Sequence, residues 1–401
     1  MHATSARRIL IHCPLPEGGL AEHAHYQANA LARAGVRTVL LASPGFLPDH
    51  SGKLYTVRHA LLPPYASRGP RLLRTAWMVL ALVVNELILA AAIVLGGYRY
   101  VLLSASSERL ALVWVWPTAL LRLLGVRIAA NIHDTPRKRL SGSALVHRWS
   151  IRAGFLPVSV GLIHEDFDAH QADIPDHVRC VRVPYGCYEA ASAPGDGDAL
   201  RAQLAPEGSG RQIFLAFGYI ADRKNIDLCI RAIAALPQAV LLVAGRVASR
   251  HDKAAAWYRA LADELDCADR VRIDDGFIPE GQVRHYFAAA DIILLTYKAE
   301  FVSQSGVLLL ASNWARPVLA SSGSGPLTTT VGTFDLGLTV PPDDPAALRD
   351  AAETLFREGH SAAGWERFRA HASWDRNVAA LLDALNGHEA RQEDGACARA
   401  A

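Results

Sequence analysis

Short apolar runs alternate with longer stretches of helical spacing from the start of the chain. Residues 8–13, 37–43 and 99–104 are runs of the first kind, and residues 21–34 are a stretch of the second kind that ends at Gly35. A short apolar run between turn-forming residues is typical of a parallel strand that is buried on both faces. A glycine directly after a helix supplies the left-handed conformation that ends it. This order of strand, glycine loop, helix and strand predicts the beginning of a Rossmann-like domain.

The same alternation continues to residue 184. Its predicted elements are the strands 126–132, 155–160 and 179–184 and the helices 106–124 (bent at Pro117), 142–154 and 164–172. Residues 188–212 then change to alanine, serine, proline, glycine and charged residues. That composition is typical of a linker between two domains.

A second series of the same kind follows the linker. Its predicted elements are the strands 213–217, 240–244, 270–273, 292–295 and 317–320 and the helices 225–236, 252–266, 280–289, 307–314, 343–356 and 375–385. The tail after Gly387 is expected to be frayed. The sequence therefore predicts an α/β protein with two Rossmann-like domains, at 1–190 and 191–370, and a final segment at 371–401.

The composition fits this architecture and limits the classes of function. A chain of 401 residues is too long for one ordinary core, and 51% hydrophobic against 20% charged residues indicates a folded protein. A net charge of +2 gives no electrostatic case for nucleic-acid binding. The six cysteines form no CxxC pair, which favours free thiols over a disulfide framework or a zinc site. The chain runs from Met1 into the first strand without a signal-peptide pattern, so we expect a cytoplasmic protein.

Residues 76–95 are the least ordinary segment of the chain. They are apolar on all sides apart from Asn85 and Glu86, and they reach the length of about 20 residues that a membrane span needs. The segment stands between two predicted strands of one sheet, and a span would place those strands on opposite sides of a bilayer. We therefore expect a buried helix or a helix on the membrane surface, where the arginines within 68–74 would meet anionic headgroups.

Residues 291–321 predict a strand, a loop, a helix and a second strand, with candidate chemistry where the helix begins. The residues at that point are Ser303, Gln304, Ser305, Gly306 and Val307. A polar turn at a helix N-terminus presents free backbone N–H groups and the positive end of the macrodipole, and both bind anions. The alternative interpretation is that Ser303 or Ser305 only caps the helix.

Two further loops follow predicted strands. Gly18-Gly19 comes after the first strand, where glycines let a backbone approach a ligand closely, although a tight turn would use the same residues. His133 follows the strand 126–132 and therefore stands at the carboxyl edge of a parallel sheet, where such folds bind ligands. It would act on a sugar hydroxyl or a phosphate, or it would bond to Asp134 or the backbone and hold the loop.

A series of motifs resembles those of the GT-B glycosyltransferases, in particular family 4, over nearly the whole chain. In chain order the motifs are Gly18-Gly19, Ile132-His133-Asp134, Phe217 to Asn225, Ala244-Gly245, Gly276 to Pro279, Ser303 to Val307 with Ala315 to Val318, and Ala372-Ser373-Trp374. The resemblance implies that the two Rossmann-like domains face each other across a cleft. It also implies an acceptor-binding domain at 1–190, a nucleotide-sugar-binding domain at 191–370 and a helix within 371–401 that crosses back to the first domain.

The resemblance assigns roles to particular residues. Arg223 and Lys224 would stabilise the charge that develops on a leaving diphosphate, and His133 would lie near the transferred sugar. The alternative for Lys224 is a solvated charge at the start of a helix. The implied donor-binding residues are Gly18, Gly19, Gly218, Gly245, Phe277, Ile278, Glu300, Ser303, Gln304, Ser305, Gly306 and Val307.

The chain departs from the family pattern at two places. The family's paired glutamates would align with Val302 and Leu310, so recognition of the donor ribose is unassigned, and the nearby Glu300 is a candidate substitute. The arginine before the diphosphate lysine would align with Tyr219, which leaves Arg223 as its replacement. Two hypotheses are therefore open: a divergent active transferase, or a degenerate GT-B protein that binds nucleotide or glycan within a membrane-associated assembly complex.

The resemblance implies transfer of a sugar from a nucleoside-diphosphate sugar to a saccharide or lipid-linked acceptor in polysaccharide or glycolipid assembly. It favours retention at the sugar carbon, with inversion still open, and metal-independent catalysis without a cofactor. We also expect a peripheral membrane contact through 68–95 at the inner face of the cell membrane. An epimerase or hydrolase would need a carboxylate base that the sequence does not clearly offer, and a nicotinamide dehydrogenase would need the missing G-x-G-x-x-G fingerprint.

Overall fold

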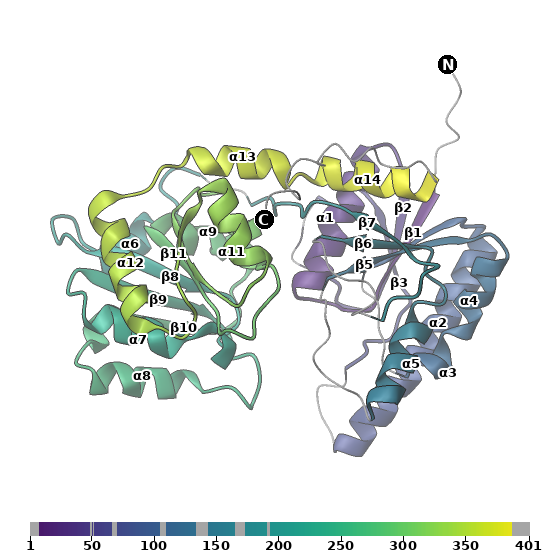
Figure 1. The fold of residues 1–401 in the computed structure, drawn as a ribbon, viewed down its shortest axis with the longest axis horizontal. Coiled ribbons are helices and arrows are strands. Elements are labelled where there is room, and N and C mark those ends of the chain that lie inside the picture. Colours follow the sequence, from purple (N-terminus) through teal and green to yellow (C-terminus); the bar gives the residue numbers. More distant parts are fainter. Residues whose placement is uncertain are drawn as a thin grey trace, which may run out of the picture. The chain divides into compact units, whose positions relative to one another are not determined.

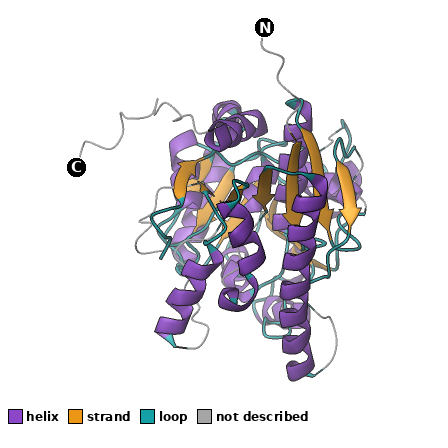
Figure 2. Ribbon diagram, turned by 90° about the vertical axis from the view of Figure 1, so that its right-hand side faces the viewer, coloured by secondary structure: helices purple, strands orange, loops and turns teal. Residues whose placement is uncertain are grey.

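The chain folds into two compact α/β units. The structure is a computed structural model, and it describes residues 8–48, 50, 52–65, 70–104, 110–133, 143–164, 173–190 and 193–386 of the chain. One unit is Met1–Gly186 with Ala372–Ala401, and the other is Cys187–His371. Each unit has a parallel sheet with helices packed on it (Figures 1 and 2), so the predicted fold class is confirmed.

The first unit contains a seven-stranded sheet in the order β3-β2-β1-β4-β5-β6-β7. Its strands are β1 (Arg8–Cys13), β2 (Arg37–Ala42), β3 (Thr56–His59), β4 (Tyr100–Leu103), β5 (Arg127–Ile132), β6 (Val160–Ile163) and β7 (Arg179–Arg182). Every neighbouring pair is parallel, so all seven carboxyl ends meet at one edge. The strand order reverses at β1, where β2 lies on one side and β4 on the other, and such a switch point is where this fold binds ligands.

Six helices of the first unit lie within the described residues. They are α1 (Gly19–Arg33), α2 (Arg71–Gly96), α3 (Ala111–Trp114), α4 (Trp116–Leu123), α5 (Ala144–Gly154) and α14 (Trp374–Asn386). Helix α2 begins five residues before the predicted segment 76–95 and ends one residue after it, where Gly97 adopts the left-handed conformation with φ 63°. In Figure 1 it lies together with α3, α4 and α5.

Helix α14 belongs to the first unit although it follows the whole second unit in the chain. Asn377, on its buried face, accepts from Gln27 Nε2 at 2.8 Å and donates to the Pro184 carbonyl at 2.7 Å. Gln27 in turn accepts from Asn131 Nδ2 on β5 at 2.8 Å. These buried amides satisfy one another, so α14 is fixed in position by polar partners as well as by its apolar residues.

The second unit contains a six-stranded parallel sheet in the order β10-β9-β8-β11-β12-β13. Its strands are β8 (Gln212–Phe217), β9 (Ala239–Gly245), β10 (Val271–Asp275), β11 (Ile292–Thr296), β12 (Val318–Ser321) and β13 (Gly337–Thr339). Its helices are α6 (Asp198–Leu204), η1 (Asp222–Lys224), α7 (Ile226–Ala234), α8 (Ala255–Glu264), η2 (Ala268–Arg270), α9 (Glu280–Ala289), α10 (Gly306–Ala311), α11 (Pro326–Phe334), α12 (Pro345–Glu358) and α13 (Ala363–His371).

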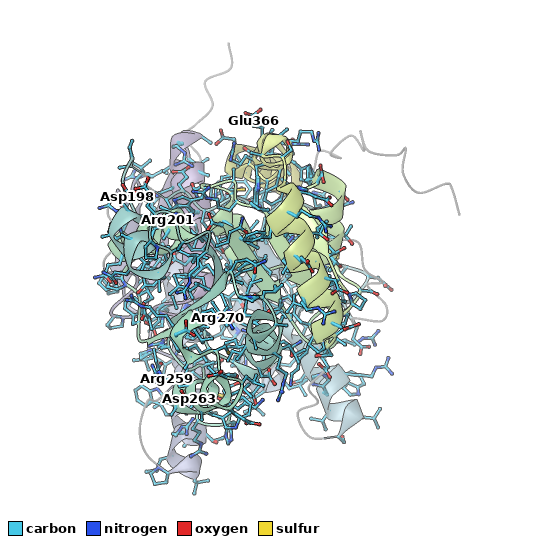
Figure 3. The ribbon with its side chains drawn as sticks, turned by 90° about the vertical axis from the view of Figure 1, so that its left-hand side faces the viewer. Asp198, Arg201, Arg259, Asp263, Arg270 and Glu366 are labelled. Atoms are coloured by element: carbon cyan, nitrogen blue, oxygen red, sulfur yellow. The ribbon has the colours of Figure 1, made fainter. Side chains whose placement is uncertain are left out.

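Two arginines join elements of this unit, and both are labelled in Figure 3. Buried Arg270 donates through Nη1 to the carbonyls of Ile233 at 2.7 Å and Leu236 at 2.8 Å, where α7 ends. The guanidinium thus joins η2 to the chain at the end of α7, and the two carbonyls also accept the backbone N–H groups of Leu236 and Ala239. Arg201 on α6 forms an ion pair with Asp291, just before β11, at 2.9 Å.

The predicted strand at 155–160 is wrong in its bounds. Phe155 is the C-cap of α5, and the Val158 N–H donates back to the Phe155 carbonyl at 3.0 Å, so the segment begins as a turn. Strand β6 starts only at Val160. Pro157 has no N–H to contribute to a ladder, and an apolar run alone does not distinguish a buried turn from a strand.

The predicted linker at 188–212 is also partly wrong, because it contains helix α6. Gly197 precedes this helix with φ 92°, and a Cβ there would lie 2.5 Å from the Ala289 amide nitrogen. The linker composition conceals a helix that packs closely on α9. The sequence gives no prediction for β3, β13, α11 or α13 either, and the two strands are only four and three residues long.

The predicted helix 106–124 is two helices in its described part. Helices α3 and α4 meet at Val115, and Pro117 lies in the first turn of α4, where a helix does not need its N–H. Of the predicted helix 164–172, only His164 lies within the described residues. The tail after Gly387 also lies outside them.

Candidate functional site

Two glycines bring the ends of β8 and β9 into contact at the carboxyl edge of the second sheet. Gly218 donates to the Ala244 carbonyl at 2.9 Å and has φ 90°, and Gly245 has φ 144°. A Cβ on Gly245 would lie 2.2 Å from the Gly218 carbonyl oxygen, so no other residue fits there without moving the backbone. The two predicted donor-site glycines therefore have a structural reason that is independent of any ligand.

Lys224 lies at the end of η1 and turns back toward the same edge. Its half-buried side chain donates from Nζ to the Phe217 carbonyl, and a Cβ on Gly218 would lie 3.1 Å from Nζ. Burial lowers the pKa of Lys224 to about 7, and the positive charge of Arg223 lowers it further in the same direction. An anion beside Nζ would favour the charged form again, so the position is suited to a phosphate.

Arg223 is exposed and lies beside two stacked aromatic rings. Its guanidinium carbon is 5.9 Å from the centroids of both Tyr297 and Phe301, whose rings are 3.9 Å apart. Its carbonyl accepts from the Lys298 N–H at 2.9 Å, which joins this loop to the loop after β11. The guanidinium keeps its donors at the surface, where it can grip an anion through two parallel hydrogen bonds.

Asn225 stands where the family pattern has a glycine, and its conformation accounts for the replacement. Its φ is 50°, in the left-handed region that glycine and asparagine adopt more readily than other residues. Its buried side chain donates from Nδ2 to Asp343 Oδ1 at 2.9 Å. The departure from the family pattern thus preserves the backbone course of the loop.

The start of helix α10 is only partly arranged as predicted. Ser305 is the N-cap residue, but its hydroxyl bonds to the Tyr297 hydroxyl at 3.0 Å and does not cap the helix. The Ser305 N–H donates to Gln304 Oε1 at 3.0 Å, and Gln304 Nε2 donates to Thr330 Oγ1 at 3.0 Å. The amides of the next two residues, Gly306 and Val307, lie in the first turn, where a helix provides no acceptor. The helix ends at Ala311, three residues before the predicted end.

The other predicted donor-binding residues of this unit lie in loops after β10 and β11. They are exposed Phe277, half-buried Ile278, exposed Glu300 and half-buried Ser303. Half-buried Val302 and Leu310 occupy the two positions where the family pattern has glutamates. Recognition of a ribose therefore has no assigned carboxylate at either position.

Gly18 and Gly19 lie at the carboxyl edge of the first sheet, where α1 begins. Gly18 has φ 91°, and its carbonyl accepts from the amides of Ala21 at 2.9 Å and Glu22 at 3.0 Å. A Cβ on Gly19 would meet no heavy atom within 4 Å. The turn conformation explains Gly18, while Gly19 leaves open space beside the first turn of α1.

His133 lies at this edge with two other histidines. Its Nε2 donates to the Ser104 carbonyl at 3.0 Å, so the alternative interpretation, in which His133 bonds to the backbone and holds the loop, is supported. The other partner considered for it, Asp134, lies outside the described residues. The ring centroids of His23 and His164 are 4.6 and 5.5 Å from that of His133. Burial lowers the pKa of His164 to about 3 and that of His23 well below its usual value.

The sequence singled out His133 but neither of its neighbours. His164 directly follows β6 as His133 follows β5, so the same signal was present, and the misplaced strand at 155–160 concealed it. His23 lies within α1, where nothing in the sequence distinguishes it from a core residue. Among the described residues, these three histidines form a group that could hold a metal ion.

The comparisons with known proteins agree with the predicted resemblance. Residues 211–358 match the family described as "Glycosyl transferases group 1". The D-inositol 3-phosphate glycosyltransferase of Acidothermus cellulolyticus is 28% identical over 239 residues, which are 57% of this chain and 52% of that protein. The chain thus spans about half the length of this relative.

Solved structures with the same fold extend over nearly the whole chain. Sucrose-phosphate synthase from Thermosynechococcus elongatus has a TM-score of 0.69 at 18% identity and covers 95% of this chain and 98% of its own. Anabaena HepE, solved in complex with UDP, has a TM-score of 0.67 at 13% identity, with 95% and 99% covered. At such identities the likeness establishes the GT-B fold alone.

Proposed function

We propose, from the membership of this chain in the GT-B glycosyltransferases, that it transfers a sugar from a nucleoside-diphosphate sugar to a hydroxyl of a saccharide or lipid-linked acceptor. The observation that carries this proposal is the pair of cations at the glycine-lined edge of the second sheet. Lys224 and Arg223 are adjacent, one half-buried with a lowered pKa and the other exposed.

The chemical step requires stabilisation of a leaving group. As the bond between the sugar and the diphosphate breaks, negative charge develops on the phosphate oxygens. Lys224 Nζ and the Arg223 guanidinium would stabilise that charge, and the first-turn amides of Gly306 and Val307 would add donors. Binding of the donor would favour the protonated form of Lys224, since an adjacent anion raises the pKa of an amine.

The acceptor must also lose a proton as the new glycosidic bond forms. In a retaining transfer, a leaving phosphate oxygen on the same face of the sugar can take this proton, so no separate general base is required. His133 would orient a sugar hydroxyl. Catalysis at the diphosphate would then be independent of a metal ion, as expected from the resemblance.

The comparisons guide the choice of substrates to test. HepE was solved with UDP, and the relatives similar to this chain are named D-inositol 3-phosphate glycosyltransferases. We therefore propose UDP as the first nucleotide and place D-inositol 3-phosphate in the acceptor panel beside lipid-linked saccharides.

A panel of nucleoside diphosphates tests the donor site by thermal stability. A ligand that binds only the folded state adds about 2.7 kcal/mol at one hundred times its dissociation constant. We expect one diphosphate to stabilise the wild type and to lose this effect in Lys224→Met. The control is Lys53→Met in the first unit, which should respond as the wild type does. If no diphosphate stabilises the wild type, the proposed donor site is wrong.

A degenerate GT-B protein is the second candidate function, and Val302 and Leu310 favour it because they leave the glutamate positions without carboxylates. Such a protein would bind nucleotide or glycan within an assembly complex. The two functions differ in their product. Only an active transferase releases a free nucleoside diphosphate when donor and acceptor are both present.

We also propose a peripheral membrane contact through an apolar surface on the first unit. This surface consists of exposed apolar side chains on or beside helices α2 to α5, and they include Leu72, Leu95, Val113, Trp116, Leu123, Leu145 and Trp149. Helix α2 is long and apolar enough to cross a membrane, with only 28% of its most apolar window buried. The strands before and after it, β3 and β4, belong to one sheet, so the two ends of α2 lie on the same side of any membrane. This supports a helix that lies on the membrane at the cytoplasmic face.

A further inference from the structure

Three histidines of the first unit bring ring nitrogens together at the carboxyl edge of its sheet. His23 comes from the second turn of α1, His133 follows β5, and His164 follows β6. One ligand nitrogen of each histidine lies within 4.8 Å of those of the other two. Strands β5 and β6 are neighbours, so the topology places two of these rings side by side.

Two of the rings have a fixed orientation. His164 donates from Nδ1 to the Val183 carbonyl at 3.1 Å, and His133 donates from Nε2 to the Ser104 carbonyl at 3.0 Å. A neutral imidazole that donates through one nitrogen carries a lone pair on the other. A bond from the distal N–H to a backbone carbonyl is the arrangement that holds metal-binding histidines in place.

The third ring is buried without a polar partner. Both nitrogens of His23, and Nε2 of His164, are buried and accept or donate no hydrogen bond within the described part of the chain. A buried polar atom without a partner costs about 1–3 kcal/mol. The His23 ring is only 3% exposed and lies 4.9 Å from the ring of Trp374, so bulk water does not satisfy it. A metal ion bound by one nitrogen of each histidine would give the His23 ring the polar partner that it lacks.

We infer that His23, His133 and His164 bind a divalent transition metal, with zinc as the first candidate. Neutral imidazoles suit zinc, whereas magnesium and calcium require oxygen ligands. Zinc–nitrogen bonds of about 2.0–2.1 Å in tetrahedral geometry place ligand nitrogens roughly 3.4 Å apart, so the rings must close by about 1 Å. His133 is half-buried, which leaves a fourth position on its side for water or an oxygen ligand.

This site goes beyond the proposed function. Stabilisation of the leaving diphosphate is assigned to cations of the second unit, and the expected metal independence concerns that diphosphate. Of the three histidines, only His133 also has a role in the proposed transfer, so the variants below replace His23 and His164. The histidines belong to the first unit. Metal binding is measured without donor or acceptor, so its failure and the failure of the proposed transfer can be told apart.

The experiment uses the full chain, purified without a polyhistidine tag and stripped with a chelator. Zinc is titrated by calorimetry, and thermal stability is followed in parallel. We expect one zinc ion per chain, a rise in melting temperature, and strong visible absorption when Co²⁺ replaces zinc in a four-coordinate site. His23→Phe keeps the aromatic contacts and removes both unpaired nitrogens. It should fold and should bind zinc at least about tenfold more weakly, since even loss of an outer-shell partner costs that much.

Two further variants complete the test. His164→Gln removes a second ligand and should also lose the zinc-dependent stabilisation. His251→Phe is the control, because His251 is exposed in the second unit, and its binding should equal that of the wild type. The inference is overturned if the wild type binds no zinc at micromolar concentration. It is also overturned if folded His23→Phe and His164→Gln bind zinc as tightly as the wild type, because the ion would then lie elsewhere.

Discussion

The charge on Lys224 is the residue-level property on which the proposed function depends most. Its surroundings hold its pKa at about 7, mainly through burial and secondly through Arg223. The side chain is therefore only partly protonated near neutral pH. A bound diphosphate would raise this pKa, so binding would take up a proton at any pH above 7.

This linkage predicts a pH dependence of diphosphate binding. Because the free protein loses the Lys224 proton as the pH rises through 7, the association constant should fall at higher pH, approaching about tenfold for each pH unit. Lys224→Arg keeps its charge and should show a much flatter profile. Calorimetry between pH 7 and 9 measures both. A wild-type profile as flat as that of the arginine variant would contradict the lowered pKa.

Gly245 provides a stability prediction. A Cβ at this position would lie 2.2 Å from the Gly218 carbonyl oxygen, and φ is 144°. Gly245→Ala should therefore reduce the free energy of unfolding by about 1–3 kcal/mol or more. The matched control is Gly281→Ala, in α9, where nothing lies within 4 Å and alanine should be neutral or stabilising by about 0.5–1 kcal/mol. Equal midpoints of denaturant unfolding for the two variants would refute the predicted contact.

The sequence predicts a functional residue where its position beside a predicted strand or helix is the signal, and it does not where residues distant in the chain must come together by folding. His133 was found because it directly follows a strand. His23 lies inside a helix and becomes distinctive only when the fold brings it to His164. The Ser305 amide was expected to bind an anion, but the neighbouring Gln304 side chain already occupies it, and no periodicity reveals such a local hydrogen bond.

At the scale of elements, helix α14 depends on a short polar network. Asn377→Ala would leave the Gln27 amide and the Pro184 carbonyl without their partner, at a cost of about 1–3 kcal/mol each in a buried position. Denaturant unfolding of the full chain measures the loss. Asp383→Ala, on the exposed face of the same helix, should change stability by less than about 0.5 kcal/mol. A comparable effect of the two substitutions would mean that the network does not hold α14.

The apolar surface on helices α2 to α5 predicts binding to lipid. Replacing exposed Trp116 and Trp149 by serine removes two aromatic anchors without opening the core. We expect the wild type to sediment with anionic vesicles and the double variant to bind several-fold more weakly. Trp257→Ser, an exposed tryptophan of the second unit, is the control. Unchanged sedimentation of the double variant would exclude this surface as the membrane contact.

Strands that are long and buried are predicted correctly from the sequence, whereas two short strands at the edge of a sheet are missed. Strands β1, β5, β8 and β11 are five or six residues long and mostly buried, as a doubly covered sheet requires, and all four are predicted from the sequence. Strands β3 and β13 are shorter edge strands with half-buried or exposed residues, so they give a weaker apolar signal. Helix α11 begins after glycines and contains three consecutive threonines, which have low intrinsic helix propensity, so its packing in the fold determines it.

At the scale of the whole molecule, two parallel sheets place their chemistry at their carboxyl edges. In the second unit this edge carries the glycine contact and the two cations, and in the first it carries the histidine cluster and the start of α1. The regular alternation of strand and helix was sufficient to predict this architecture. The acceptor lies beyond such prediction, since its recognition depends on loop side chains that no periodicity specifies.

The central claim is sugar transfer that depends on the Lys224 site. The most direct measurement is detection of both products by mass spectrometry, after incubation of UDP-sugars with the acceptor panel. We predict a glycosylated acceptor and an equal amount of UDP from the wild type, with a loss of about 100-fold or more in Lys224→Met. UDP that binds at the Lys224 site without any glycosylated product across the donor and acceptor panels would contradict an active transferase and favour the degenerate binding protein.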